Sequence, residues 1–265
     1  MPIAVYDHCE SMFVTSALLR LQQLHERAAA EEIESAAYRC QDSGTCPLTN
    51  NCLHRFPQPA GPAARRGGDN VVYLRHDALR RPAEDFTAPP PDDDPEFETG
   101  LVDEAGNLII RRKLTLANVQ LREKGLRLLL DHWNSLASGI VPRFTAFNPL
   151  LVRDFGLLGS FNVVDVSATD ASRFTIELHA SGRVFDEDIS GMSMGQHNTP
   201  IISRVLMADY YRAKISAAPS YHQVILRSRD VRTAYARLIL PFSTDGQNVN
   251  RLLVGFRGLP VPAEL

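Results

Sequence analysis

Three cysteines and a histidine, close together near the start of the chain, are the residues best suited to chemistry. Cys40, Cys46 and Cys52 are each separated by five residues, and His54 follows Cys52 with one residue between them. Thiolates and imidazoles are the ligands that zinc takes in tetrahedral sites. With Cys9 as a fourth thiolate, the set could instead hold an iron–sulfur cluster. The spacing is wider than in the usual metal-binding pairs, so reduced structural cysteines or a redox-sensing thiol pair are alternatives.

A second candidate site lies in the later half of the chain, around a segment rich in glycine and methionine. Met192 and Met194 could line an adaptable apolar pocket, with His197 beside them. Tyr210, on the helix that follows, and His179, on the strand before, complete the predicted ligand pocket. The alternative for each is simpler: core packing for the methionines and the tyrosine, and a polar rim position for the histidines.

Sequence signatures of catalysis are missing from the chain. It contains no G-x-S-x-G, H-E-x-x-H, G-x-x-x-x-G-K-[ST] or G-x-G-x-x-G motif. Residues 186–188 are three consecutive acids, but on a turn they are most simply solvated. We therefore expect a protein that is not an enzyme.

Composition places the chain among ordinary globular proteins. Of 265 residues, 44% are hydrophobic and 22% charged, and the net charge is −3. Nucleic-acid binders usually carry a positive balance or a basic stripe, so nucleic acid is disfavoured as a partner. No apolar run approaches the ~20 residues that cross a bilayer. The segment Met1–Cys9 does not resemble a secretory signal. We expect a cytoplasmic protein, with no membrane partner and with its cysteines reduced or bound to metal.

The first half of the chain divides into a helix and a tether. Apolar residues at three- and four-residue steps predict a helix over residues 11–38. Residues 57–100 are rich in proline, first basic and then acidic, which predicts a partly disordered linker. At the end of this linker, residues 101–114 predict a short hairpin that turns at Glu104-Ala105-Gly106-Asn107.

The second half of the chain mixes helices with closely spaced strands. In the predicted strand over 173–180, apolar and other residues alternate, which predicts that Phe174, Ile176 and Leu178 lie on the same side. Short connections between strands require antiparallel neighbours. The expected fold is α+β: a five-stranded antiparallel sheet with helices on one face. The predicted elements are helices over 117–137 and 199–216 and strands over 159–166, 173–180, 221–227, 233–240 and 248–256.

Three local motifs carry a resemblance to a known family. The first is the predicted helix Leu130–Leu136, followed by Pro142 and by Phe147-Asn148-Pro149-Leu150. The second is the acidic segment Phe185–Gly191, which follows the second predicted strand. The third is Ala236–Gly246, followed by the apolar run Val249–Phe256. With these motifs the C-terminal half resembles a PAS domain, of the divergent group common in alphaproteobacteria. The resemblance implies a sensor or interaction module that binds a small molecule between its sheet and helices, or pairs with other proteins.

These observations predict a domain plan. Residues 1–56 form a helical segment with the cysteine cluster, and 57–115 form the proline-rich charged linker with its hairpin. Residues 116–258 form the PAS-like sensor domain, and 259–265 form a tail that leaves no room for an effector domain. Output must then pass through binding to a protein partner or to a second copy, as a homodimer. The amphipathic helices Phe13–Ala28 and Val119–Ala137 could be the pairing faces, or could pack within the chain.

Three functions follow as hypotheses. The first is a non-catalytic bacterial sensory or regulatory protein in signal transduction, acting by ligand-tuned protein–protein interaction. The second is a metal- or redox-responsive regulator that uses Cys40, Cys46, Cys52 and His54. The third is a DNA-linked transcription regulator, whose phosphate contacts would come from Arg65, Arg66, Arg75, Arg80 and Arg81.

Overall fold

The computed structural model describes residues 16–33, 97–104, 106–137, 141–180, 188–227 and 232–261. The chain divides into two units, residues 1–32 with 90–265, and residues 33–89. Apart from Ile33, everything described below belongs to the first unit. The predicted cysteine cluster and most of the predicted linker lie outside the described residues. No helix among the described residues is long and apolar enough to span a membrane.

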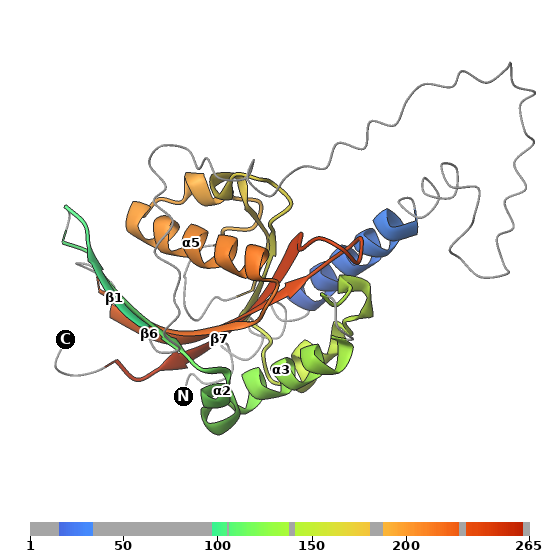
Figure 1. Cartoon of the computed structure of the whole chain (residues 1–265), viewed down its shortest axis with the longest axis horizontal. Coiled ribbons are helices and arrows are strands. Elements are labelled where there is room, and N and C mark those ends of the chain that lie inside the picture. Colours follow the sequence, from blue (N-terminus) through green and yellow to red (C-terminus); the bar gives the residue numbers. More distant parts are fainter. Residues whose placement is uncertain are drawn as a thin grey trace, which may run out of the picture. The chain divides into compact units, whose positions relative to one another are not determined.

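A single antiparallel sheet organises the described part of the chain (Figure 1). Its seven strands lie in the order β1-β2-β5-β6-β7-β3-β4. Their bounds are Phe97–Val102 (β1), Leu108–Leu114 (β2), Phe161–Asp165 (β3), Thr175–Ala180 (β4), Ser220–Arg227 (β5), Arg232–Phe242 (β6) and Arg251–Leu259 (β7). The prediction of an α+β fold with an antiparallel sheet is therefore confirmed.

The predicted number of five strands is wrong, because the hairpin expected in the linker extends the sheet. β1 pairs with β2, and β2 pairs with β5 from Leu108 opposite Arg227 to Leu114 opposite Tyr221. The turn is closed by Asp103, whose carboxylate accepts hydrogen bonds from the Asn107 backbone and side chain at 2.9 and 2.8 Å. The sequence revealed this hairpin but not its neighbour β5, which lies more than a hundred residues later.

Helices cover both faces of the sheet, so the prediction of helices on one face is also wrong. Helices α2 (Leu116–Arg122), α3 (Lys124–Leu136) and α4 (Leu150–Asp154) lie on one face, which we call the α3 face. Helix α5 (Pro200–Ser216) lies on the other, the α5 face (Figure 1). Strand β6 explains why: Leu238 is buried on the α3 face and Ile239 on the α5 face, so neither face can be left in water.

The predicted helix over 117–137 is two helices. Glu123 interrupts it with extended backbone (φ −129°, ψ 91°), so α2 ends at Arg122 and α3 begins at Lys124. The buried side of α3 consists of Leu126, Leu129, Leu130 and Trp133. The Trp133 indole Nε1–H donates a 2.8 Å hydrogen bond to the Pro241 carbonyl. The predicted helix over 199–216 matches α5 closely.

The N-terminal helix, residues 16–33, also packs on the α3 face. Ala17, Leu21 and Ala28 are buried there, with Leu24 partly buried beside them. The predicted pairing faces of this helix and of α3 therefore pack within the chain. The other predicted helical residues, 11–15 and 34–38, lie outside the described residues.

A bulge in edge strand β4 overturns the predicted alternation there. Val163 of β3 lies opposite Leu178, yet the next residue, Val164, lies opposite Ile176. Glu177 is thus the extra residue of a β-bulge. As a result Phe174 and Ile176 face α5, whereas Leu178 is buried on the α3 face. The bulge also brings Glu177 within reach of Arg251 on β7.

We predict that Gly125→Ala destabilises the protein although alanine is the better helix former. A Cβ at Gly125, in the first turn of α3, would lie 2.7 Å from the Phe155 carbonyl oxygen and 3.2 Å from Leu157 Cδ2. Separating α3 from α4 should lower the free energy of unfolding by about 1–3 kcal/mol. Gly258→Ala is the control, since nothing lies within 4 Å of a Cβ there. Urea unfolding would check this, and equal stabilities of the two variants would contradict it.

Candidate functional site: a buried ionic cluster beneath α5

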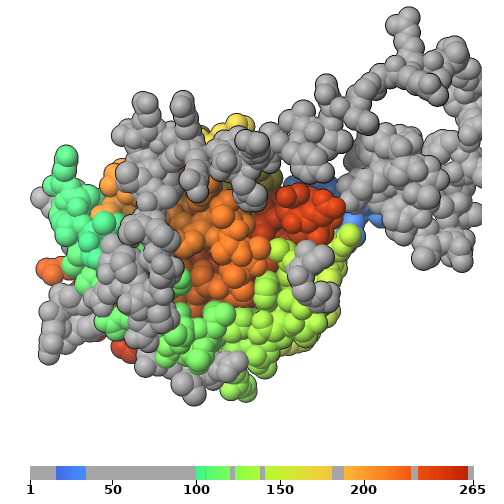
Figure 2. All heavy atoms as spheres, in the orientation of Figure 1, coloured from blue at the N-terminus to red at the C-terminus, as the bar shows by residue number. Residues whose placement is uncertain are grey.

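The most unusual site in the described chain is a carboxylate fully buried between helix α5 and the sheet. Asp209, on the inner side of α5, forms ion pairs with Arg111 of β2 through Oδ1 and with Arg237 of β6 through Oδ2. His222 of β5 lies nearby, with Nε2 3.8 Å from Asp209 Oδ1. All four side chains are at most 5% exposed. The outer side of α5, orange in Figure 2, lies at the molecular surface, where Arg204 is exposed.

The sheet register brings the basic members of this cluster together. Lys113, His222 and Arg237 are direct partners across β2, β5 and β6. Side chains of direct cross-strand partners point to the same face. Arg111 lies two residues before Lys113 and therefore on that face as well. Four basic side chains from three strands thus gather under one acidic residue of the helix.

The pKa shifts in the cluster follow from burial and from these neighbours. Burial alone would raise the pKa of Asp209, but His222, Arg237 and Arg111 outweigh it and lower that pKa. Burial lowers the pKa of His222 to about 3, with the arginines adding to the effect and Asp209 opposing it. At neutral pH the imidazole is therefore uncharged. Asp209 carries a negative charge that is shared by the guanidinium groups of Arg111 and Arg237.

Two tyrosines adjoin the cluster and remain protonated. Burial raises the pKa of Tyr210 to about 12, and Arg237 opposes the shift. The pKa of Tyr235 is raised for the same reason. The Arg237 guanidinium carbon lies 5.7 Å from the centre of the Tyr210 ring, within the range of a cation–π contact. The cluster can therefore bind and orient polar groups as a hydrogen-bond donor.

The residues predicted to line a ligand pocket lie on or near the same face. Met194 and Tyr210 are buried in the apolar core of the α5 face, and Met192 packs against that core. His179 is buried on edge strand β4. His197 is partly buried and its Nδ1 accepts a 3.1 Å hydrogen bond from the Thr199 backbone N–H, just before α5 begins. The structure thus gathers both methionines and Tyr210 around α5; their role in ligand binding stays a prediction.

The predicted metal ligands Cys40, Cys46, Cys52 and His54 lie outside the described residues. Within the part of the chain that the structure describes, no three His, Cys, Asp or Glu side chains are grouped so as to hold a metal ion.

Sequence reasoning missed most of the buried ionic cluster. The sequence feature that could have revealed the cluster was the presence of charged residues inside otherwise apolar strands and helices. Arg237 interrupts the apolar run of β6, Arg111 follows two isoleucines of β2, and Asp209 stands in α5 between apolar residues and tyrosines. Such positions require a buried partner of opposite charge. The sequence does not say which partner each residue finds.

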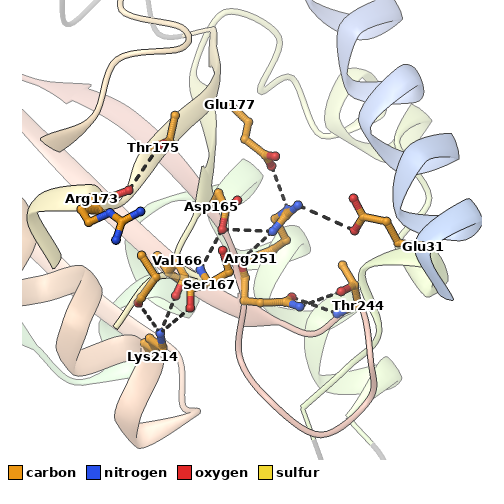
Figure 3. A network of polar contacts seen from close by, with 12 residues as sticks. Glu31, Asp165, Val166, Ser167, Arg173, Thr175, Glu177, Lys214, Thr244 and Arg251 are labelled. Atoms are coloured by element: carbon orange, nitrogen blue, oxygen red, sulfur yellow. Dashed lines mark hydrogen bonds and ion pairs between the residues drawn. The ribbon is translucent and has the colours of Figure 1, made fainter. Parts of the chain in front are cut away.

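A second ionic network centres on Arg251 of β7, on the α3 face (Figure 3). Its Nε and Nη1 pair with Glu177 Oε2 at 2.8 Å and Asp165 Oδ1 at 3.2 Å. Its Nη2 lies 3.9 Å from Glu31 Oε2 of the N-terminal helix. Burial raises the pKa of Glu177, and Arg251 opposes the shift. This network links the N-terminal helix to three strands of the sheet.

The N-terminal helix has further polar contacts to the segment between α3 and α4. His25 Nε2 lies 2.8 Å from the Thr145 carbonyl oxygen. The Thr145 hydroxyl donates to Glu32 at 2.7 Å, and Arg143 forms an ion pair with the same carboxylate. The helix is therefore held by both apolar and polar contacts.

Next to Asp165 of the Arg251 network, Lys214 ties α5 to the connection after β3 (Figure 3). Its ammonium donates to the carbonyls of Val166 and Ala168 at 2.6 and 2.7 Å. Burial lowers the pKa of Lys214. With Asp209, this lysine fixes α5 to the sheet at a second point.

No protein-family model, no curated protein and no solved structure matches the chain.

We predict that Asp209→Asn lowers the free energy of unfolding by about 3–5 kcal/mol, because it leaves two buried guanidinium groups without their counter-charge. Asp188→Asn is the matched control. Its pair with Arg20 spans 3.3 Å between side chains that are about half exposed, and should be worth under about 1 kcal/mol. Urea unfolding of both variants would check this. A loss for Asp209→Asn as small as the control's would show that the cluster does not stabilise the fold.

We also predict that His222 makes stability fall in mild acid. Its pKa is 6.5 when unfolded and about 3 when folded, so between these values the unfolded chain binds the extra proton. Stability should then decrease as pH falls from 6.5 towards 4, by up to about 1.4 kcal/mol per pH unit. His222→Gln should flatten this slope in urea unfolding measured from pH 4 to 8. An unchanged slope would mean that His222 is not held neutral.

Proposed function

We propose that the chain is a non-catalytic sensory or regulatory protein whose residues 116–258 form a PAS-like domain acting by ligand-tuned protein–protein interaction. Its place of action would be the cytoplasm, and its partner another protein or a second copy of the chain.

The observation that carries this proposal is the path of the chain through strands β3 to β7. Two strands come first, a helical insert containing α5 follows, and three strands complete the sheet. The first strand, β3, lies between the second strand and the last. Two N-terminal and three C-terminal strands around a helical insert, in one antiparallel sheet, form the core that the sequence pattern predicted for the part of the chain that resembles a PAS domain. The hairpin β1–β2 is an addition at the β5 edge.

The closing motif of the resemblance has a defined role in this sheet. In the turn between β6 and β7, Asp245 Oδ1 accepts hydrogen bonds from the Ser243 hydroxyl at 2.7 Å and from the Gln247 backbone at 2.7 Å. Gly246 follows with φ +76°, a conformation that favours glycine. The Ser-x-Asp-Gly pattern thus builds the turn that aligns the last two strands.

The two faces of the sheet suggest how binding could be converted into output. On the α5 face, buried charges set the position of the helix. On the α3 face, the N-terminal helix is held partly by polar contacts from Glu31, Glu32 and His25. A protein partner could replace these contacts with its own. β7 contributes to both, since Phe256 lies opposite Arg237 and Arg251 contacts the N-terminal helix. A ligand that shifts α5 would thereby bias the docking of the N-terminal helix.

The second candidate, a metal- or redox-responsive regulator, rests on the three thiols and one imidazole within residues 40–54. In that case Cys40, Cys46, Cys52 and His54 would receive the signal and the sheet domain would transmit it.

The test is to purify the full, untagged chain from bacterial cytosol and to record its native mass spectrum together with an elemental metal assay. We expect a bound small molecule, no stoichiometric metal, and a change in oligomeric state or partner binding when that molecule is removed. One zinc per chain, lost in Cys46→Ser and kept in Cys9→Ser, would favour the second candidate, as would one iron–sulfur cluster per chain that is lost in both variants. An empty chain whose association never changes would contradict ligand tuning.

A further inference from the structure

Arg237 holds hydrogen-bond donors that the described protein does not use. Its side chain is 0% exposed, and only Nη2 reaches Asp209. Nε and Nη1 are buried without a hydrogen-bond partner among the described residues. Leaving a buried donor of a charged group unpaired is costly, and folded proteins rarely do so.

His222 presents a further unused position beside it. The two residues are direct partners across β5 and β6 and lie on the same face. His222 Nδ1 is buried and also has no hydrogen-bond partner among the described residues. In the tautomer protonated at Nδ1, the imidazole is a donor at that position.

The charge balance at this point favours an anion. Asp209 is shared by Arg111 and Arg237, so its charge is divided between two cations. A second acceptor of negative charge near Arg237 would use Nε and Nη1 and would gain from low local polarity.

We propose that Arg237 and His222 form a recognition site for a small anion, either the carboxylate of a small molecule or an inorganic anion, between α5 and the sheet. The anion accepts hydrogen bonds from the Arg237 guanidinium and from His222 Nδ1–H. The assignment deepens the proposed function, and rests on it for the role of the anion as input. An anion here competes with Asp209 for Arg237, so its binding acts on the contact that positions α5.

The test is a nuclear magnetic resonance titration of the full chain, which reads the arginine Nε–H signals directly. Sodium acetate and sodium bromide are the two probes, and the Arg237 signal is assigned by its loss in Arg237→Lys. If that variant does not fold, the displacement of the signal in His222→Gln assigns it. Arg251 is the internal control, because its Nε already pairs with Glu177 at 2.8 Å.

We expect the Arg237 signal to shift saturably with at least one probe while the Arg251 signal stays in place. Saturation by acetate alone identifies a carboxylate ligand, and saturation by bromide identifies an inorganic anion. His222→Gln should raise the half-saturating concentration several-fold. An Arg237 signal that neither probe moves, or that drifts in parallel with Arg251, overturns the anion site. That failure would leave the regulatory proposal standing, since oligomeric state and partner binding test it separately.

Discussion

The contact between Asp209 and the two arginines of the sheet is the interaction on which the α5 side of the structure depends. A carboxylate without any exposure is tolerated only because Arg111 and Arg237 surround it. These arginines come from strands β2 and β6, with β5 between them. One helix residue therefore holds together three strands, one of which belongs to the added hairpin. The same few atoms therefore link α5 to β6 and to the strand that joins the added hairpin to the sheet.

The opposite face is organised differently. There the N-terminal helix, α3 and α4 bury a continuous apolar core, and charges lie at its margin. Arg251 gathers carboxylates from β3, β4 and the N-terminal helix, and the bulge at Glu177 is what brings β4 into that group. Buried ionic contacts fix α5 on one face, whereas mixed and partly exposed contacts hold the N-terminal helix on the other. In the proposed function, a signal received on the α5 face would change an interaction on the α3 face.

An anion bound at Arg237 would connect the position of α5 on one face with the docking of the N-terminal helix on the other. The unused donors of Arg237 lie beside the residue that anchors α5, and the neighbouring strand carries Arg251 and its contacts to the N-terminal helix. Binding near Asp209 would thus act on α5, which Lys214 also ties to the connection after β3. A ligand can shift an equilibrium only by its difference in affinity for two states. Because Asp209 and the anion would share the Arg237 guanidinium, the affinity for the anion would differ between two positions of α5.

Local pattern determined much of this protein from its sequence alone. The period of apolar residues located α5 and the buried side of α3, and the Ala236–Gly246 motif located the connection from β6 to β7. Short connections made the sheet antiparallel. These features depend on neighbours a few residues apart, so the sequence contains the whole cause. Even so, Glu123 broke one predicted helix in two by a local change of backbone that periodicity does not register.

Only the tertiary structure decided which distant residues meet. The sequence showed a hairpin at 101–114 but not that β2 would pair with β5, and so it could not place Arg111 next to Arg237. It showed alternation in β4 but not the bulge at Glu177, which moves one side chain to the opposite face. It gave no sign that His222 and Asp209 would be buried together. Register, face and charge pairing arise from packing across the whole sheet, and no short stretch of sequence contains that information.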